Sequence, residues 1–207
     1  TVVPALALAV LIIWGLNVWS TLMMPENEEE PILVEVYAQQ FNWTVRYSGG
    51  DNVLGYATVH EIAGGNILGV DMQDPASIDD IIAKELHLPV GQPIKFLFRS
   101  QDVIHSAYFP HFRAQMNCVP GAITQFQFTP SITTAEIRQN KDVKDHVEEV
   151  NEIRKAKGED VWDFNYVLLC NKICGAAHYN MQMDIIVETE DEFNAWLKEQ
   201  KTVAETL

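Results

Sequence analysis

An uncharged apolar segment at the amino end is the feature that most constrains this chain. Residues 2–24 read VVPALALAVLIIWGLNVWSTLMM, 23 residues without a charged side chain. At about 1.5 Å of rise per residue, a helix of this length crosses a hydrocarbon core of about 30 Å. A secretory signal peptide would instead have a basic start and a shorter apolar core. We therefore predict a transmembrane helix over residues 1–25 rather than the buried helix of a soluble protein.

The residues on either side of this segment indicate its setting. The sequence starts inside the apolar run, so we expect the helix to be one half of a hairpin whose earlier part is missing. An acidic stretch, PENEEEP, follows at residues 25–31, and the first basic residue of the chain is Arg46. Because basic residues favour the cytoplasmic side of a membrane, we predict that the domain after the helix lies outside the cytoplasm.

Charge and motif content exclude several function classes. The chain has 14 Lys and Arg against 29 Asp and Glu, a formal charge of −15, which argues against a nucleic-acid partner held through its phosphates. Neither a glycine-rich phosphate loop nor a CxxCH haem attachment motif is found in the sequence. Three cysteines are too few for a disulfide-stapled scaffold.

Beyond residue 31 the sequence has the pattern of a mainly β domain. Short stretches rich in Val, Ile, Phe, Tyr and Thr are separated by turns that contain Gly or Pro, such as SGGD at residues 48–51. We predict an antiparallel sandwich or barrel over residues 31–188. The expected strands cover residues 32–38, 41–47, 94–99, 123–129 and 164–170.

Two segments depart from the strand pattern. Residues 134–158 are highly charged, and their sparse apolar side chains recur at helical spacing, which predicts an amphipathic helical insert lying on the sandwich. At residues 189–207 we predict a helix followed by a tail, because Thr189 and Glu192 form the T-x-x-E pattern of a capping box. Both segments are interpreted as packing or surface elements, and neither is assigned a function.

Potential metal ligands gather in residues 170–181, which read CNKICGAAHYNM. Thiolate and thioether sulfur select copper over hard cations such as Mg²⁺, and imidazole also suits copper. Two thiolates four residues apart can bridge two copper ions, each of which then takes one imidazole, while the thioether and a backbone carbonyl complete the two coordination shells. The second imidazole is expected from His105, which follows a predicted strand. The candidate side-chain ligands are His105, Cys170, Cys174, His178 and Met181.

Other interpretations of these residues stay open at this point. Zinc also binds Cys and His, although its sites seldom use Met. Cys170 and Cys174 could instead form a disulfide in an oxidising compartment, and a single blue copper ion would need only one thiolate. His111 competes with His105 as the second imidazole, and Cys118 is expected to be a buried, unpaired thiol.

The order of these motifs resembles one known family. DVIHS at residues 102–106, a Pro-Gly turn at residues 120–121 and the C-x-x-x-C-G-x-x-H-x-x-M motif are similar to subunit II of the haem–copper cytochrome c oxidases. The aromatic stretch at residues 40–47 and LHLPVG at residues 86–91 stand in the family's order. The resemblance implies a cupredoxin-like Greek-key β-sandwich that carries the binuclear copper centre called CuA. It further implies a ligand set of His105, Cys170, the backbone carbonyl of Lys172, Cys174, His178 and Met181.

The resemblance also implies a function and partners. Subunit II accepts electrons from cytochrome c, or from a haem c domain of a partner complex, and passes them to haem in subunit I. The assembled enzyme is a proton-translocating oxidoreductase that reduces O₂ to water in subunit I, so no O₂ chemistry is expected on this chain. The expected location is the inner, cytoplasmic membrane of a bacterium, with the copper domain on the periplasmic face. The alternatives are a membrane-anchored mononuclear cupredoxin, a copper-delivery protein and a copper-less quinol oxidase subunit II.

Three positions depart from the family's pattern. Lys172 stands where the family commonly has a Glu whose side chain helps to hold Mg²⁺ or Mn²⁺, so this subunit is expected not to supply that ligand. Phe41 stands where many members have the Trp thought to receive the electron, so Phe41, Trp43 and Tyr47 are the candidate electron-accepting aromatic residues. Ala122 follows the Pro-Gly turn where Arg is frequent, which leaves the contacts toward the haem side open.

Overall fold

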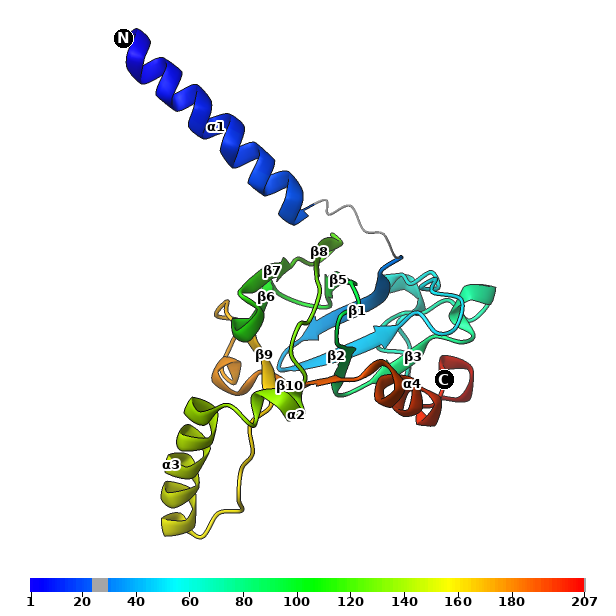
Figure 1. The fold of residues 1–207 in the computed structure, drawn as a ribbon. Coiled ribbons are helices and arrows are strands. Elements are labelled where there is room, and N and C mark those ends of the chain that lie inside the picture. The colour runs from blue at the N-terminus through cyan, green and yellow to red at the C-terminus, as the bar shows by residue number, and fades with distance from the viewer. Residues whose placement is uncertain (24–29, 207) are drawn as a thin grey trace.

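A computed structural model describes residues 1–23 and 30–206, and Figure 1 shows how its elements are arranged. The apolar segment forms helix α1 (Val2–Met23), and none of the residues described in it is buried. The most apolar window of α1 has a mean hydropathy of 2.2, and the helix is long enough to cross a membrane. Residues 24–29 lie outside the described residues; they comprise the end of the predicted helix and most of the acidic stretch that follows it.

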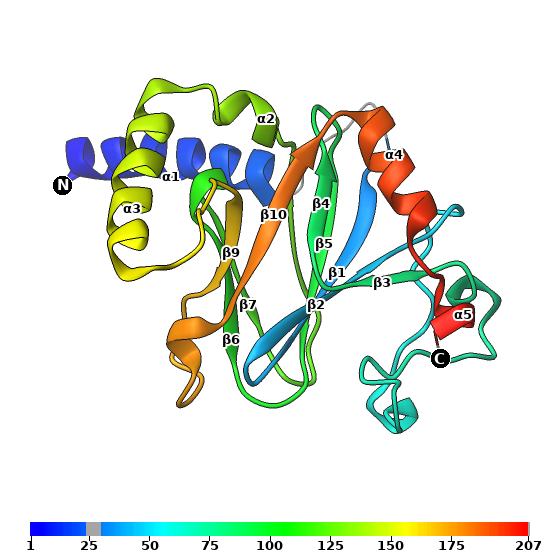
Figure 2. The same ribbon diagram turned by 90° about the horizontal axis from the view of Figure 1, so that it is seen from below.

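Two five-stranded sheets form a β-sandwich, and Figure 2 shows its strands lengthwise. The first sheet, in the order β3-β2-β1-β5-β8, consists of β1 (Ile32–Gln39), β2 (Asn42–Tyr47), β3 (Ile81–Ala83), β5 (Ile94–Ser100) and β8 (Thr124–Phe128). The second sheet, in the order β4-β10-β9-β6-β7, consists of β4 (Leu86–Pro89), β6 (His105–Phe109), β7 (Ala114–Cys118), β9 (Tyr166–Cys170) and β10 (Gln182–Glu188). The five strands expected from the sequence are present, and their bounds differ from the expectation by two residues at most.

The strand directions correct one part of the prediction. Most neighbouring strands are antiparallel, but β1 runs parallel to β5 and β10 runs parallel to β4. Each parallel pair joins strands that are far apart in the chain, because the chain visits the opposite sheet before it returns to form the second strand. The result confirms the cupredoxin-like Greek-key sandwich that the family resemblance implied, whereas strand patterning alone predicted an antiparallel sandwich or barrel.

Alternation along the strands builds the core between the sheets. Ile94, Phe96 and Phe98 of β5 are buried, whereas the residues between them are partly exposed. Leu168 of β9 and Ile185 of β10 are fully buried and belong to the same apolar cluster. The candidate metal ligands lie at the start of β6, at the end of β9 and in the loop that follows β9, so the packing of the sandwich determines where their side chains point.

A buried ionic network lies on the outer face of the first sheet, under the segment between β2 and β3. Arg46 donates hydrogen bonds to Glu35 at 2.7 Å and to Asp80 at 2.9 Å. Arg99 donates to the second oxygen of Glu35 at 2.7 Å. Arg46 also donates to the carbonyl of Gly55, which belongs to the covering segment. The sequence pattern did not predict this network, because its members are far apart in the chain.

The charged insert forms two helices rather than one. These are α2 (Thr134–Ile137) and α3 (Lys141–Lys157). The break falls before α3, where the Asn140 side chain accepts a hydrogen bond from the backbone N–H of Asp142 and caps the helix. Val143 and Val147 near the start of α3 pack against the core, but the helix then extends away from the sandwich (Figure 1). The insert therefore does not lie on the sandwich along its whole length, because its charged side chains favour solvent.

A carboxy-terminal helix, α4 (Glu190–Glu199), covers the opposite edge of the sandwich. Thr189 and Glu192 form the predicted capping box at its start. Its Trp196 ring stacks on His87, with ring centroids 4.0 Å apart. A short helix, α5 (Val203–Thr206), follows, and residue 207 of the predicted tail lies outside the described residues.

Candidate metal centre

The candidate ligands come together where strands β6 and β9 meet the loop that follows β9. β9 ends at Cys170, and the loop of residues 171–181 leads back into β10. β6 begins at His105 and pairs with β9 so that Ala107 lies opposite Cys170. Residues two apart on a strand share a face, so this register puts His105 on the same side of the sheet as Cys170. The backbone N–H of Cys170 donates to the carbonyl of Met181 at 3.0 Å, which closes the loop.

The sulfur and nitrogen atoms of the cluster lie close together. The Sγ atoms of Cys170 and Cys174 are 3.8 Å apart. His105 Nδ1 lies 3.8 Å from Cys170 Sγ, and His178 Nδ1 lies 3.6 Å from Cys174 Sγ. Met181 Sδ lies 3.8 Å from Cys174 Sγ. Each thiol therefore has the other thiol and one imidazole beside it.

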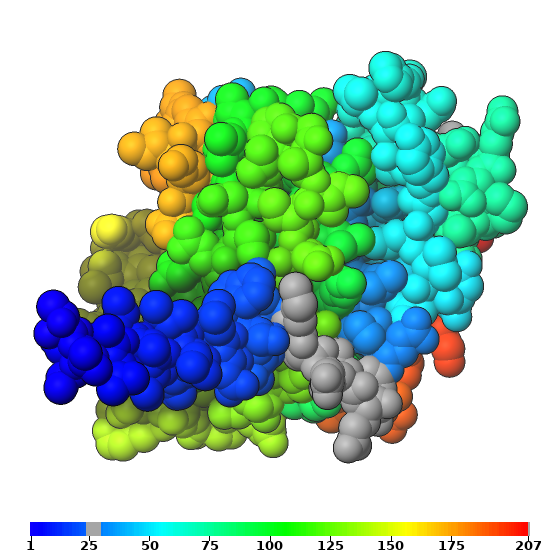
Figure 3. All heavy atoms as spheres, turned by 90° about the horizontal axis from the view of Figure 1, so that it is seen from above, coloured from blue at the N-terminus to red at the C-terminus, as the bar shows by residue number. Residues whose placement is uncertain are grey.

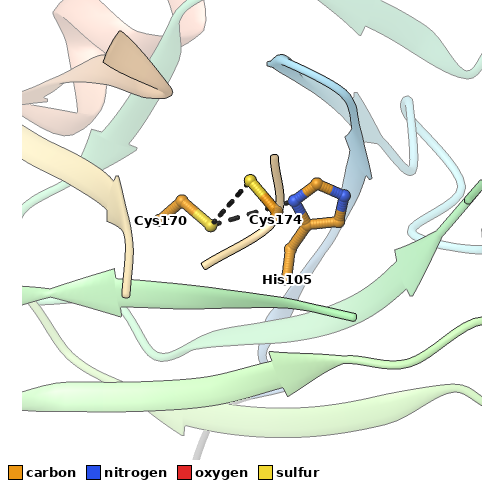
Figure 4. A group of neighbouring side chains, drawn as sticks. All are labelled: His105, Cys170 and Cys174. Atoms are coloured by element: carbon orange, nitrogen blue, oxygen red, sulfur yellow. Dashed lines mark hydrogen bonds between the residues drawn. The ribbon is translucent and has the colours of Figure 1, made fainter. Parts of the chain in front are cut away.

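These separations fit a small first-row metal ion. With bonds of about 2.3 Å to thiolate and about 2.0 Å to imidazole, two ligands of one tetrahedral ion lie about 3.5 to 3.8 Å apart. Figure 4 shows the ligand atoms of His105, Cys170 and Cys174 facing one space, and all lie within 4.8 Å of one another. The carbonyl oxygen of Lys172 is 3.2 Å from Cys170 Sγ, within reach of a metal held by that sulfur. The donor atoms present therefore fit a soft metal, and copper in particular.

The two cysteines of the loop are free thiols in this structure. A disulfide requires an S–S distance of about 2.05 Å, so the disulfide alternative does not match a separation of 3.8 Å between the sulfurs. Burial and the neighbouring sulfur of Cys170 raise the pKa of the Cys174 thiol to about 11. Two ionised thiols side by side in a buried site need a cation, so a metal would bind here with release of protons.

Asp102 holds the ring of His105 in place. Its carboxylate lies 2.8 Å from His105 Nε2, which leaves Nδ1 directed toward the thiols. The backbone N–H groups of Gln40 and Val103 also donate to this carboxylate, each at 2.7 Å. Burial acts to raise the pKa of Asp102, but the hydrogen bonds from His105 and the two backbone groups outweigh it and leave the pKa lowered. Asp102 therefore presents a charged acceptor to the imidazole.

The turn between β1 and β2 contacts the loop of residues 171–181, here called the metal loop. The side chain of Gln40 donates a hydrogen bond to the carbonyl of Cys174. Gly175 has a φ of +142°, and a Cβ built on it would lie 2.8 Å from the ring of Phe41. Only glycine allows the loop to approach the turn this closely. Gly175 therefore both permits the tight turn of the loop and leaves room for the ring of Phe41.

The three aromatic candidates for receiving an electron are in different settings. Trp43 is 4 % exposed, and its Nε1 donates to the carbonyl of Met181 at 3.4 Å, behind the site. Tyr47 is 1 % exposed, and its hydroxyl donates to the carbonyl of His87. A surface role in receiving electrons does not fit either of these buried rings. Phe41 is half-buried at the turn beside the metal loop.

The other candidates lie apart from the cluster or beside it. His111, in the short helix η3 (Pro110–Phe112), contacts the rings of Phe164 and Tyr166 edge-on and is not part of the cluster. Cys118 lies opposite His105 on β7 and is buried, as expected. Burial raises the pKa of the Cys118 thiol to about 12, which fits a neutral, unpaired side chain.

Sequence reasoning did not identify two residues at this site. Asp102 was part of a recognised motif, but only the fold shows that it accepts a hydrogen bond from His105. Tyr179 is 87 % exposed and follows His178 directly. The one sequence signal for Tyr179 was its position inside the ligand motif, directly after His178. An aromatic side chain in such a loop is not expected to join the apolar core.

Comparisons with known proteins bear on the identity of the domain. A family model described as cytochrome C oxidase subunit II, periplasmic domain, matches residues 32–139, more than half of the chain. The chain is 36 % identical over 193 residues to the alternative cytochrome c oxidase subunit 2 of Bradyrhizobium diazoefficiens, an alignment that covers 92 % of this chain and 58 % of that protein. It is 26 % identical over 125 residues to cytochrome c oxidase subunit 2 of Thermostichus vulcanus, covering 60 % and 28 % of the two chains.

A solved structure agrees with the fold. The crystal structure of the periplasmic domain of subunit II of cytochrome oxidase from Bradyrhizobium japonicum superposes with a TM-score of 0.50 at 19 % sequence identity. The superposition covers 85 % of this chain and 95 % of that one. At this level of identity the likeness shows the fold alone. The chain spans little more than half the length of the first curated relative, at 58 %.

Proposed function

This chain belongs to the cytochrome c oxidase subunit II family, and from that premise we propose that its β-sandwich holds a binuclear CuA centre and relays electrons within a haem–copper oxidase. Reduced cytochrome c, or a haem c domain of a partner complex, supplies the electrons. Haem in subunit I receives them, and O₂ is reduced to water there rather than on this chain. In this proposal residues 31–188 form the copper domain, and residues 1–25 form its membrane anchor.

One observation carries the proposal. Two free thiols, Cys170 and Cys174, lie 3.8 Å apart with an imidazole nitrogen beside each. Both thiolates would bridge the two copper ions, while His105, His178 and Met181 would each bind one ion. Two ions bridged in this way share one unpaired electron, so that the centre changes its geometry little when it gains or loses an electron.

Lys172 has two separate consequences in this proposal. Its backbone carbonyl would complete the coordination, because a carbonyl oxygen does not depend on the identity of the side chain. Its side chain ends in an ammonium group and offers no oxygen to a hard cation. We therefore expect this subunit to contribute no ligand to a Mg²⁺ or Mn²⁺ ion at the boundary with subunit I.

The membrane setting follows from α1 and from the family. The chain has an apolar helix long enough to span a membrane, and its relatives carry a periplasmic domain. We propose the inner, cytoplasmic membrane of a bacterium as its location, with the copper domain on the periplasmic face. Subunit I and further oxidase subunits would pack around α1, whose described residues are all unburied in the isolated chain.

The alternatives fit the site less well. A mononuclear cupredoxin or a delivery protein for single copper ions needs one thiolate, yet a second thiol lies at bridging distance from the first. A copper-less quinol oxidase subunit II would not require the five candidate ligands, which are sulfur or imidazole side chains gathered at one site. Neither alternative accounts for the pair of sulfurs.

Copper counting with electron paramagnetic resonance (EPR) tests the proposal. Beyond the copper of the haem–copper site in subunit I, the purified oxidase should contain two copper ions per copy of this chain, and these two should share one unpaired electron. Cys170→Ser and Cys174→Ser should each abolish that mixed-valence signal, whereas Cys118→Ser, a change at the neighbouring buried thiol, should retain it. A single copper ion per chain, or a mixed-valence signal that survives in either loop variant, would contradict the bridging assignment.

A further inference from the structure

A groove begins at the end of the apolar helix α1. One cavity of about 460 Å³ is lined by Thr21 and Leu22, in the last turn of α1, and by residues of β8. Figure 3 shows the end of α1, in blue, against the green surface that contains β8. A second cavity of about 570 Å³ is lined by residues of β8, η3, α2 and α3. The two cavities share four lining residues and so form one groove, here called the α1 groove: Phe112, Arg113, Phe128 and Thr129.

Aromatic rings form much of the wall of the α1 groove. The rings of Phe112 and Phe128 stack with their centroids 4.7 Å apart, and Phe126 lines the cavity beside α1. All three rings are half-buried, and each packs against the core of the sandwich with part of its surface. The remaining part of each ring adds apolar surface to the groove, directly beside the end of an apolar helix. Gathered apolar surface at such a place indicates contact with a membrane or another molecule.

Arg113 supplies the one charged side chain, among the described residues, that lines the cavity beside α1. The other four arginines of the chain each donate a hydrogen bond to a carboxylate or a backbone carbonyl: Arg46, Arg99, Arg138 and Arg154. The exposed guanidinium of Arg113 has no such acceptor in the part of the chain that the structure describes. A chain with a net charge of −15 thus presents a guanidinium at the end of its apolar helix, the level at which lipid phosphates lie in a membrane.

The backbone at Arg113 supports a role for its side chain. Its φ is +54°, in the left-handed region that favours glycine, and its N–H donates to the carbonyl of Pro110 at 3.2 Å to end η3. Glycine would occupy this position with less strain. An arginine held in a strained backbone at the junction of two cavities therefore indicates that its guanidinium has a function there.

We propose that the α1 groove binds a membrane phospholipid, with the lipid phosphate on the guanidinium of Arg113 and the aliphatic chains against Leu22 and Phe126. A guanidinium recognises phosphate through two parallel N–H donors. The aliphatic chains continue along α1 into the bilayer, and the larger cavity has room for the headgroup beyond the phosphate. This inference goes beyond the proposed function: it rests on the anchoring of α1 in a membrane and does not depend on copper.

A count of retained lipid in the purified oxidase complex tests this inference. The complex is reconstituted in bilayers of phosphatidylethanolamine and phosphatidylglycerol, extracted in a mild detergent and weighed by native mass spectrometry. We expect Arg113→Gly to retain one phospholipid fewer per copy of this chain than the wild type. Glycine suits the left-handed backbone, so this variant should fold, which thermal unfolding checks. Arg113→Gln, which keeps a long polar side chain without the charge, should lose the same lipid.

Arg154→Met is the matched control, because it removes a partly exposed arginine of α3 that does not line the groove. It should retain the wild-type number of lipids. The inference is overturned if either Arg113 variant keeps that number, or if Arg154→Met loses as much lipid. A wash with inorganic phosphate at constant ionic strength should leave the lipid bound, and its release would overturn the inference in favour of a site for free phosphate. Absence of the mixed-valence copper signal from the wild type would contradict the proposed function instead, and would leave the lipid count unchanged.

Discussion

Two clusters of polar side chains are buried in the same sandwich, and they differ in what completes them. Around Arg46, two guanidinium groups and two carboxylates face one another at 2.7 to 2.9 Å. The candidate metal centre instead gathers thiols, imidazoles and a thioether, all of which offer lone pairs. The charges of the first cluster are balanced by its own side chains, whereas the second cluster would need a cation once its thiols ionise. Internal charge balance thus distinguishes a structural polar cluster from a binding site.

The ionic network is nevertheless incompletely satisfied at one atom. Oδ1 of Asp80 is buried and has no hydrogen-bond partner among the described residues. Burial raises the pKa of Asp80 to about 7, against the opposing effects of Arg46 and of the backbone N–H of Gly55. The cluster therefore has a titratable member, which allows its contribution to stability to be measured separately from that of the metal centre.

The largest expected effect is a loss of unfolding free energy when the ionic network around Arg46 is broken. Arg46→Met would leave Glu35 and Asp80 buried beside each other with one fewer counter-charge, and should lower the free energy of unfolding by about 3 to 5 kcal/mol. Urea unfolding measures this loss, while copper EPR of the folded fraction should stay unchanged. As a control, Arg154→Met removes a partly exposed ion pair on α3 and should cost no more than about 1 kcal/mol. Equal losses of unfolding free energy in the two variants would mean that the buried network stabilises the fold no more than an exposed ion pair does.

The next prediction distinguishes a local change in the metal loop from a general loss of stability. Gly175→Ala would put a Cβ 2.8 Å from the Phe41 ring, so the loop must shift and the copper EPR spectrum should change. Gly158→Ala, at the end of α3, also has a positive φ (+74°) but open space around it. Gly158→Ala should cost about 1 kcal/mol of stability because of its positive φ alone, whereas Gly175→Ala should cost about 1 to 3 kcal/mol because of the added contact, and only Gly175→Ala should alter the spectrum. An unchanged spectrum in the first variant would show that the loop is not held by this contact.

A smaller effect is the pH dependence of stability that Asp80 confers. The folded chain keeps the Asp80 proton up to a pKa of about 7, whereas the unfolded chain loses it near the ordinary aspartate pKa of 3.8. The folded state thus binds more protons over this range, so this stabilising contribution is complete below about pH 4 and is lost as the pH rises to about 7. Asp80→Asn should flatten the decline in unfolding free energy between pH 5 and 7, by at most about 1.4 kcal/mol per pH unit. An unaltered slope, measured by urea midpoints, would reject this assignment.

The smallest effect is expected in the insert, which belongs to neither cluster. Ile153 on α3 is 53 % exposed, and Ile153→Ser should change stability by less than about 0.5 kcal/mol. Val143→Ser, near the start of the same helix, should cost about 1 kcal/mol, because Val143 packs against the core. Thermal unfolding of the two variants compares them directly. A larger loss at Ile153 would mean that the far end of α3 has a partner in the folded chain.

The extent of sequence-based prediction differed along the chain for physical reasons. Helix α1 and the five expected strands depend on local hydrophobic patterns, and these elements formed where they were expected. The parallel pairing of β1 with β5 and the break at Asn140 were not predicted, because they depend on chain crossing and on a single capping side chain. Tyr47 was a candidate electron-accepting aromatic residue, and its burial was not predicted: the C-terminal helix covers it, with Trp196 edge-on at 5.4 Å.

By itself, the sequence determined the apolar helix and the β character of the domain, and it predicted a metal-binding loop at residues 170–181. The four ligand candidates between Cys170 and Met181 are close in the chain, so a short loop brings them together whatever surrounds it. Only the tertiary structure decided that His105 rather than His111 joins them, that Asp102 orients its ring, and that His178 alone of the five faces solvent in the described chain. Those outcomes depend on strand register and burial, which arise when residues distant in the sequence pack into one core.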